Sequence, residues 1–178
     1  VTFQLKANGT VVNSTTTPSQ SYSYSYTVTQ DANMELVATQ GTNSKTAAFI
    51  VQVPRNVVSQ AIPNWIRQGI NYHPTDPTKV GLALYAPGKN FVHVIGSFNN
   101  WAVNDTYFMK KDTTNPDLYW IELNGITPQQ LYTFQYRTND LRKVADPYSP
   151  QILSSYDDPW ISASTYPNLP AFPAGQGF

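Results

Sequence analysis

The chain has 178 residues, enough for one large domain or two small ones. Only 12% of them are charged, and the 11 basic and 11 acidic side chains cancel, so no net charge attracts nucleic acid or an anionic membrane. The absence of cysteine excludes disulfides, thiolate zinc sites and cysteine nucleophiles. No apolar stretch reaches the roughly 18 residues of a membrane-spanning helix.

Uncharged polar residues dominate the rest of the composition. Ser, Thr, Asn and Gln make up about a third of the chain, and 13% of the residues are aromatic. This composition is typical of secreted all-β proteins. The chain carries no signal-peptide pattern, so it is either cytoplasmic or the processed form of an exported, secreted or cell-surface protein, and its start within an apparent strand favours a trimmed form.

Apolar and polar residues alternate with a period of two through most of the chain, which predicts strands rather than helices. Asn8-Gly9 is a strong hairpin turn signal. In residues 1–54 the alternation predicts about five strands, at Phe3–Leu5, Val11–Val12, Tyr22–Val28, Met34–Thr39 and Thr46–Val53. An immunoglobulin-type sandwich has seven strands. We therefore predict a β-sandwich over residues 1–54, complete or lacking its opening strands.

A second series of strands follows a predicted linker at residues 55–69, where Pro and Gly interrupt the pattern. The strands are predicted at Val80–Tyr85, Phe91–Ile95, Thr106–Met109, Leu118–Leu123 and Leu131–Thr138. This spacing favours a second sandwich over residues 70–150. Residues 151–178 are rich in proline, which predicts an extended strap. The fold class is therefore all-β, with two immunoglobulin-like sandwiches and a strap.

The sequence brings no catalytic groups together. Glycosidases need two carboxylates about 5–10 Å apart, but the acidic residues are scattered and only Asp157 and Asp158 are adjacent. His73 and His93 have no carboxylate at metal-ligand spacing. The common hydrolase, phosphate-binding and dinucleotide-binding motifs do not occur. We predict no catalytic residues, no metal and no cofactor in this chain, and leave open whether the parent protein is an enzyme.

Carbohydrate is the ligand class that fits the remaining residues, because sugars stack their C–H faces on aromatic rings beside neutral polar groups. Four tryptophans are candidates: Trp65, Trp101, Trp120 and Trp160. Alternation along the strand from Leu118 places Trp120 on the face opposite the apolar one. Each tryptophan can instead be a packing side chain. The same holds for the stripe formed by Tyr22, Tyr24 and Tyr26.

One short string is more specific. Residues 92–101 read V-H-V-I-G-S-F-N-N-W, a strand that ends at Gly96 and a turn that leaves Trp101 at its tip. This string resembles the G-S/D-F-N-x-W signature of carbohydrate-binding module family 48. These early-set sandwiches precede the barrel in branching enzymes, isoamylases and pullulanases of glycoside hydrolase family 13, and one is the glycogen-binding domain of AMP-activated protein kinase β subunits.

Further segments follow in the order of that family. Leu118–Gly125 resembles the family's central W-x-x-x-L strand and turn, and residues 131–136 resemble its Y-x-Y/F strand. Ala145–Ser149 resembles the A-D-P-Y-A/S segment through which the family's chain leaves the sandwich towards the barrel. The resemblance covers about residues 69–150. Gly69–Tyr72 and the tail near residues 173–176 are similar to segments of secreted bacterial α-amylases with two N-terminal sandwiches.

The resemblance also implies site residues. Glycogen-binding members use the turn tryptophan, a lysine in the Y-K-F strand and a second tryptophan before the D-P step. Trp101 matches the first, Thr133 replaces the lysine, and Lys143 falls near the second tryptophan. We therefore predict a carbohydrate site at Trp101, helped by Asn100 and Lys143, and add Trp120 as a further candidate.

The catalytic strings of the family 13 barrel do not occur in these residues. We interpret the chain as a non-catalytic N-terminal accessory region of an α-glucan-active glycoside hydrolase, in which this region positions the barrel. Whether it also binds starch or glycogen stays open. The partners implied are α-glucan and the protein's own barrel, with no nucleic acid and no membrane span. The alternative is an adhesin-like, purely structural pair of sandwiches without sugar binding.

Overall fold

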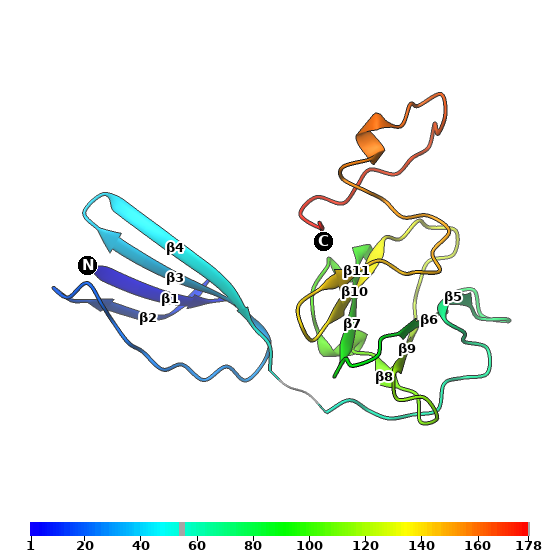
Figure 1. Cartoon of the computed structure of the whole chain (residues 1–178), viewed down its shortest axis with the longest axis horizontal. Coiled ribbons are helices and arrows are strands. Elements are labelled where there is room, and N and C mark those ends of the chain that lie inside the picture. The colour runs from blue at the N-terminus through cyan, green and yellow to red at the C-terminus, as the bar shows by residue number, and fades with distance from the viewer. Residues whose placement is uncertain (54–55, 178) are drawn as a thin grey trace. The chain divides into compact units, whose positions relative to one another are not determined.

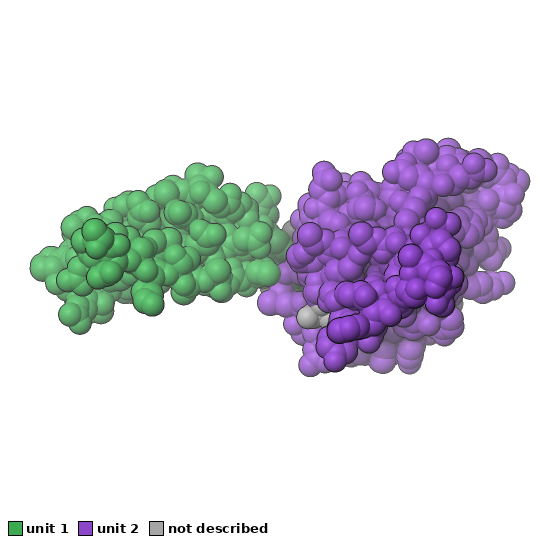
Figure 2. All heavy atoms as spheres, turned by 90° about the horizontal axis from the view of Figure 1, so that it is seen from above, with its two compact units in different colours: residues 1–55 green, residues 56–178 purple. Residues whose placement is uncertain are grey.

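The structure is a computed structural model that describes residues 1–53 and 56–177. Its regular elements are strands in three antiparallel sheets and short 3-10 turns, which confirms the predicted all-β class. The chain divides into two compact units, residues 1–55 and residues 56–178 (Figure 2). Among the described residues, no helical segment has the length and apolar character needed to cross a lipid bilayer.

The first unit contains one antiparallel sheet with the strand order β2-β1-β3-β4 (Figure 1). Its strands are β1 (Thr2–Ala7), β2 (Thr10–Thr16), β3 (Ala32–Gln40) and β4 (Asn43–Val51). Asn8 and Gly9 both have positive φ and connect β1 to β2, as the Asn-Gly pair predicts. The pairing sets Leu5 opposite Leu36 and Met34 opposite Phe49, so these side chains share one apolar face.

The segment from Tyr22 to Val28 lies over this apolar face and does not pair as the predicted strand. The Tyr22 ring stacks on Phe3 with 5.8 Å between centroids, and its hydroxyl donates to Asn13 Oδ1 at 3.2 Å. A segment that crosses the face of a sheet cannot reach the backbone groups at its edge. Within the described residues this unit therefore has one sheet, and its second layer is this tyrosine-bearing segment.

The second unit is a sandwich of two sheets. One sheet has the order β5-β6-β9-β8, from β5 (Gly69–Tyr72), β6 (Val80–Tyr85), β9 (Leu118–Leu123) and β8 (Lys110–Lys111). The other has the order β11-β10-β7, from β11 (Lys143–Val144), β10 (Phe134–Thr138) and β7 (Val92–Gly96). Alternate side chains of both sheets fill one core, which includes Leu82, Val94, Tyr119, Ile121 and Tyr136.

The strand predicted at Thr106–Met109 is mostly a turn. Residues Asp105–Tyr107 form a 3-10 turn, and the Asn104 side chain caps it by accepting from the Thr106 N–H at 3.1 Å. Asn favours such local hydrogen bonds over strand pairing. Only the short strand β8 and an isolated bridge between His93 and Phe108 remain of the predicted ladder.

Residues 56–68, most of the predicted linker, pack on the β5-β6-β9-β8 sheet, first along its edge strand β8 and then on its outer face. The Lys111 N–H donates to the Val58 carbonyl at 3.0 Å, and the Gln60 N–H donates to the Lys111 carbonyl at 2.9 Å. Ile66 is buried against Ala83 and Trp120. These residues therefore add a layer to the second unit, whereas Pro54 and Arg55 lie outside the described residues.

The predicted strap, residues 151–177, forms no strand, but it is not extended throughout: it contains several turns, including the 3-10 turn Asp158–Trp160. Its last part returns to the β11-β10-β7 sheet (Figure 1). Gln135 Nε2 donates to the Gln176 carbonyl at 3.0 Å, and Lys143 Nζ donates to Gln176 Oε1 at 3.2 Å. In this structure the strap therefore lies against its own sandwich.

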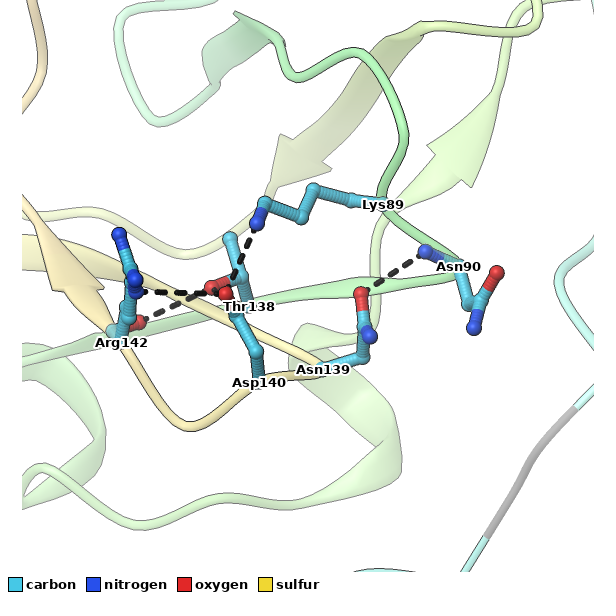
Figure 3. A network of polar contacts seen from close by, with 6 residues as sticks. All are labelled: Lys89, Asn90, Thr138, Asn139, Asp140 and Arg142. Atoms are coloured by element: carbon cyan, nitrogen blue, oxygen red, sulfur yellow. Dashed lines mark hydrogen bonds and ion pairs between the residues drawn. The ribbon is translucent and has the colours of Figure 1, made fainter.

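A polar network holds the turn between β10 and β11 (Figure 3). Lys89 Nζ donates to Asp140 Oδ2 at 2.8 Å, and Arg142 Nε lies 3.4 Å from the same oxygen. The hydrogen bonds from Lys89 and Thr138 lower the pKa of Asp140 to about 2. This network ties the loop before β7 to the end of β10, and so supports the pairing of β7 with β10.

Candidate functional site

The site begins where β7 ends, at Gly96. A Cβ atom at this position would lie 2.6 Å from the Thr133 carbonyl oxygen, so a larger residue does not fit without a backbone shift. The Ser97 N–H donates to the same oxygen at 2.9 Å. The chain can therefore leave the sheet directly after its last pair with β10.

The turn that follows is held by the side chain of Asn99. Its Oδ1 accepts from the Gly96 N–H at 2.9 Å, and its Nδ2 donates to the carbonyls of Val94 and Ala102 at 3.2 Å and 3.1 Å. The next two residues, Asn100 and Trp101, have φ values of 52° and 60°. This left-handed conformation is rare for a bulky side chain, and such strain is a reason to look for function.

Trp101 is half-buried and forms one wall of a groove with a volume of about 220 Å³. The opposite walls come from residues 131–135, from the segment 145–153 and from the end of the strap at Pro170, Phe172, Pro173 and Gln176. Neutral hydrogen-bonding groups of Thr133, Gln135 and Gln176 lie among these apolar walls. An aromatic wall beside neutral polar groups suits a sugar.

Gln135 supplies a buried acceptor in this groove. Only 5% of Gln135 is exposed, and its Nε2 is engaged by the Gln176 carbonyl. Its Oε1 has no hydrogen-bond partner among the residues that the structure describes. A buried acceptor is normally satisfied, but this oxygen has almost no exposed surface, so a ligand hydroxyl reaches it only where the neighbouring strap contact is displaced.

Asp146 also lines the groove, but its oxygens are committed to the fold. Tyr136 donates its hydroxyl to Asp146 Oδ2 at 2.7 Å, and the Tyr148 N–H donates to Asp146 Oδ1 at 2.7 Å. Burial raises the pKa of Tyr136 well above 10, and the neighbouring carboxylate raises it further. The acid of the A-D-P-Y string therefore anchors the exit segment to β10.

The structure brings some of the predicted site residues together and separates one. Trp101 and Asn100 share the turn, and Lys143 reaches the groove indirectly, through its bond to Gln176. Trp120 is only 2% exposed, its indole N–H donates to the Gln60 carbonyl at 3.0 Å, and Lys110 Nζ lies 4.8 Å from its ring centre. Trp120 has no free face on which a sugar could stack, so it is a packing side chain and not a sugar contact.

Sequence reasoning missed Gln135 and Gln176. Alternation does place Gln135 on the face of β10 opposite the core, and the structure agrees. The contact with Gln176 joins residues that are 41 positions apart, and no local pattern reports such a pairing. Among residues 1–53 and 56–177, no cluster of three or more His, Asp or Glu side chains could hold a metal ion.

A two-sheet sandwich that presents a half-exposed tryptophan beside neutral polar groups has the build of a carbohydrate-binding module. Residues 68–149 match the family described as Carbohydrate-binding module 48 (Isoamylase N-terminal domain). The matched segment is the part of the chain that carries the motifs resembling this family.

Two curated relatives are similar to part of the chain. The 1,4-alpha-glucan branching enzyme GlgB of Fusobacterium nucleatum is 30% identical over 87 residues, which cover 47% of this chain and 14% of that protein. The 1,4-alpha-glucan branching enzyme GlgB of Butyrivibrio fibrisolvens is 31% identical over 106 residues, which cover 57% of this chain and 16% of that protein. The chain thus spans only a small part of the length of these relatives.

Proposed function

We propose that the second unit binds α-glucan of the starch or glycogen type through the groove at Trp101. The observation that carries this proposal is the strained turn, which places Trp101 in one groove with the neutral polar residues Thr133, Gln135 and Gln176. The match of residues 68–149 to a carbohydrate-binding family supports sugar as the ligand class. The names of both relatives, 1,4-alpha-glucan branching enzymes, support α-glucan as the kind of sugar.

We further propose that this region is an accessory part of a longer, secreted bacterial enzyme of glycoside hydrolase family 13, in which it positions the catalytic barrel. The support is that the match covers only 14–16% of each relative's length. The reading frame that encodes the chain tests this role. A family 13 barrel encoded beyond residue 178 is the expected result, and a frame without one would contradict it.

A scaffold without sugar affinity is the second candidate, and specific contacts favour it. Thr133 stands where glycogen-binding members of the family carry lysine. The ammonium group of Lys143 is engaged by Gln176, and Phe172 of the strap lines the groove. If the region is only a scaffold, the groove is a packing surface for the chain's own strap.

Titration calorimetry of the whole chain with maltoheptaose separates the two candidates. We expect binding, and we expect Trp101→Ala to weaken it by about tenfold or more, or about 1.4 kcal/mol, because the stacking surface is lost. Trp160→Ala is the matched control, since Trp160 is 84% exposed and does not line the groove. Absence of binding would leave only the scaffold role, and equal binding by Trp101→Ala and the parent protein would show that the sugar site lies elsewhere.

A further inference from the structure

A second, larger cavity opens beside the groove at Trp101. Its volume is about 730 Å³, and it lies between the end of β5 and the loop 126–132. Its walls include Tyr72, His73, Gln130, Leu131 and Tyr132. Ligand sites typically measure about 300–1,000 Å³. The second cavity falls within that range, whereas the groove at Trp101, at about 220 Å³, falls below it.

The two cavities adjoin each other on the surface of the second unit. Four residues line both of them: Ile70, Leu131, Tyr132 and Phe134. Leu131 is 62% exposed at this shared boundary. A ligand that fills the small groove can therefore continue across Leu131 into the larger cavity without leaving the surface of the second unit.

The loop that walls the second cavity is held in place by its own hydrogen bonds. The Tyr132 hydroxyl accepts from the Thr127 N–H and donates to Gln130 Oε1, each at 3.1 Å. The Tyr132 ring packs against Phe98, with 6.3 Å between ring centroids. The wall between the two cavities is thus an ordered aromatic ridge.

The chemistry of the second cavity suits a neutral, hydroxylated chain. Its described lining consists of aromatic and aliphatic side chains with Thr, Gln, Tyr and His groups, and it includes no Asp, Glu, Lys or Arg. Tyr72, at its rim, is 78% exposed and so offers a ring face to a ligand. An anion or a cation would find no opposite charge there, whereas a sugar would find stacking surfaces and neutral hydrogen-bonding groups.

We propose that this cavity extends the glucan site, so that a linear α-glucan runs from Trp101 over Leu131 to Tyr72. The inference rests on the proposed function and deepens it. It makes the module selective for long glucan chains over short ones, because only a long chain reaches both aromatic contacts.

The test compares maltotriose with maltoheptaose in titration calorimetry of the whole chain. We expect maltoheptaose to bind the parent protein about tenfold more tightly than maltotriose. In Tyr72→Ala, maltoheptaose should fall to the affinity of maltotriose, while maltotriose should bind as it does to the parent. Tyr85→Ala is the matched control, because Tyr85 is 48% exposed and lines neither cavity.

The outcomes separate this inference from the proposed function. Equal affinity for the two sugars, or a preference for maltoheptaose that survives in Tyr72→Ala, would overturn the extended site and leave the Trp101 site standing. No binding of either sugar to the parent protein would overturn both. An unchanged melting temperature of Tyr72→Ala confirms that the variant is folded.

Discussion

Asn100 and Trp101 adopt left-handed backbone conformations in succession. Each such residue costs about 1–2 kcal/mol when it is not glycine. The three hydrogen bonds of the Asn99 side chain offset this cost, because they tie the turn to Val94, Gly96 and Ala102. The orientation of the indole therefore depends on the side chain two positions before it.

Replacement of Asn99 tests this dependence. We expect Asn99→Ala to lower the free energy of unfolding by about 1–3 kcal/mol, because the groups that it satisfies lose their partner. We also expect weaker binding of maltoheptaose, since the turn no longer fixes the ring of Trp101. Urea unfolding and calorimetry measure the two effects.

The neighbouring position provides the control. Asn100→Gly should keep or raise stability, because glycine adopts positive φ without a steric cost and the Asn100 side chain is exposed. If Asn99→Ala were as stable as the parent and bound maltoheptaose equally well, the turn would owe its conformation to something else.

Residue-scale prediction from sequence succeeded where the signal was local. The string from Gly96 to Trp101 indicated both the end of the strand and the tip of the turn. Trp120 shows the limit: alternation correctly placed it opposite the main core, but the layer that covers it comes from residues 56–68, about 60 positions earlier. Periodicity reports which face a side chain takes, and it cannot report what later covers that face.

At the scale of elements, strand β10 is joined to the exit segment by the hydrogen bond from Tyr136 to Asp146. Burial, and then the nearby carboxylate, raise the pKa of Tyr136 well above 10. Between pH 10 and that higher value, the unfolded chain loses the phenolic proton and the folded protein keeps it. The stabilising contribution of the Tyr136 phenol is therefore fully present below pH 10, and it decreases as the pH rises above 10.

Alkaline unfolding measures this contribution. We expect the free energy of unfolding to fall above pH 10 with a contribution from Tyr136 of up to about 1.4 kcal/mol per pH unit. Tyr136→Phe should be less stable at neutral pH, because Asp146 loses a partner, but it should show a flatter decline above pH 10. Tyr156→Phe serves as the control, since Tyr156 is 80% exposed. Identical slopes for Tyr136→Phe and the parent would contradict the assignment.

Most elements of the second unit follow from alternation and turn signals, because each strand there pairs with others and buries one face. The stretch from Tyr22 to Val28 has an equally clear alternation but forms no ladder. A period of two requires an extended chain with one buried face. It does not decide whether the backbone joins a sheet edge or crosses the face of the sheet.

At the scale of the whole chain, the residues of both proposed binding surfaces come from the second unit, residues 56–178. The strap could be recognised from its prolines, but its return to the sheet beside Gln135 could not, because it depends on contacts between distant residues. The groove at Trp101 is therefore assembled from the turn, β10, the exit segment and the strap, and only the first three lie within the matched family segment.

The most direct measurement is a crystal structure of the chain with maltoheptaose. The account predicts a glucosyl ring stacked on the indole of Trp101, in the groove that Thr133, Gln135 and Gln176 also line. A structure at saturating maltoheptaose in which this groove holds no sugar, or in which the sugar lies on another surface of the protein, would contradict it.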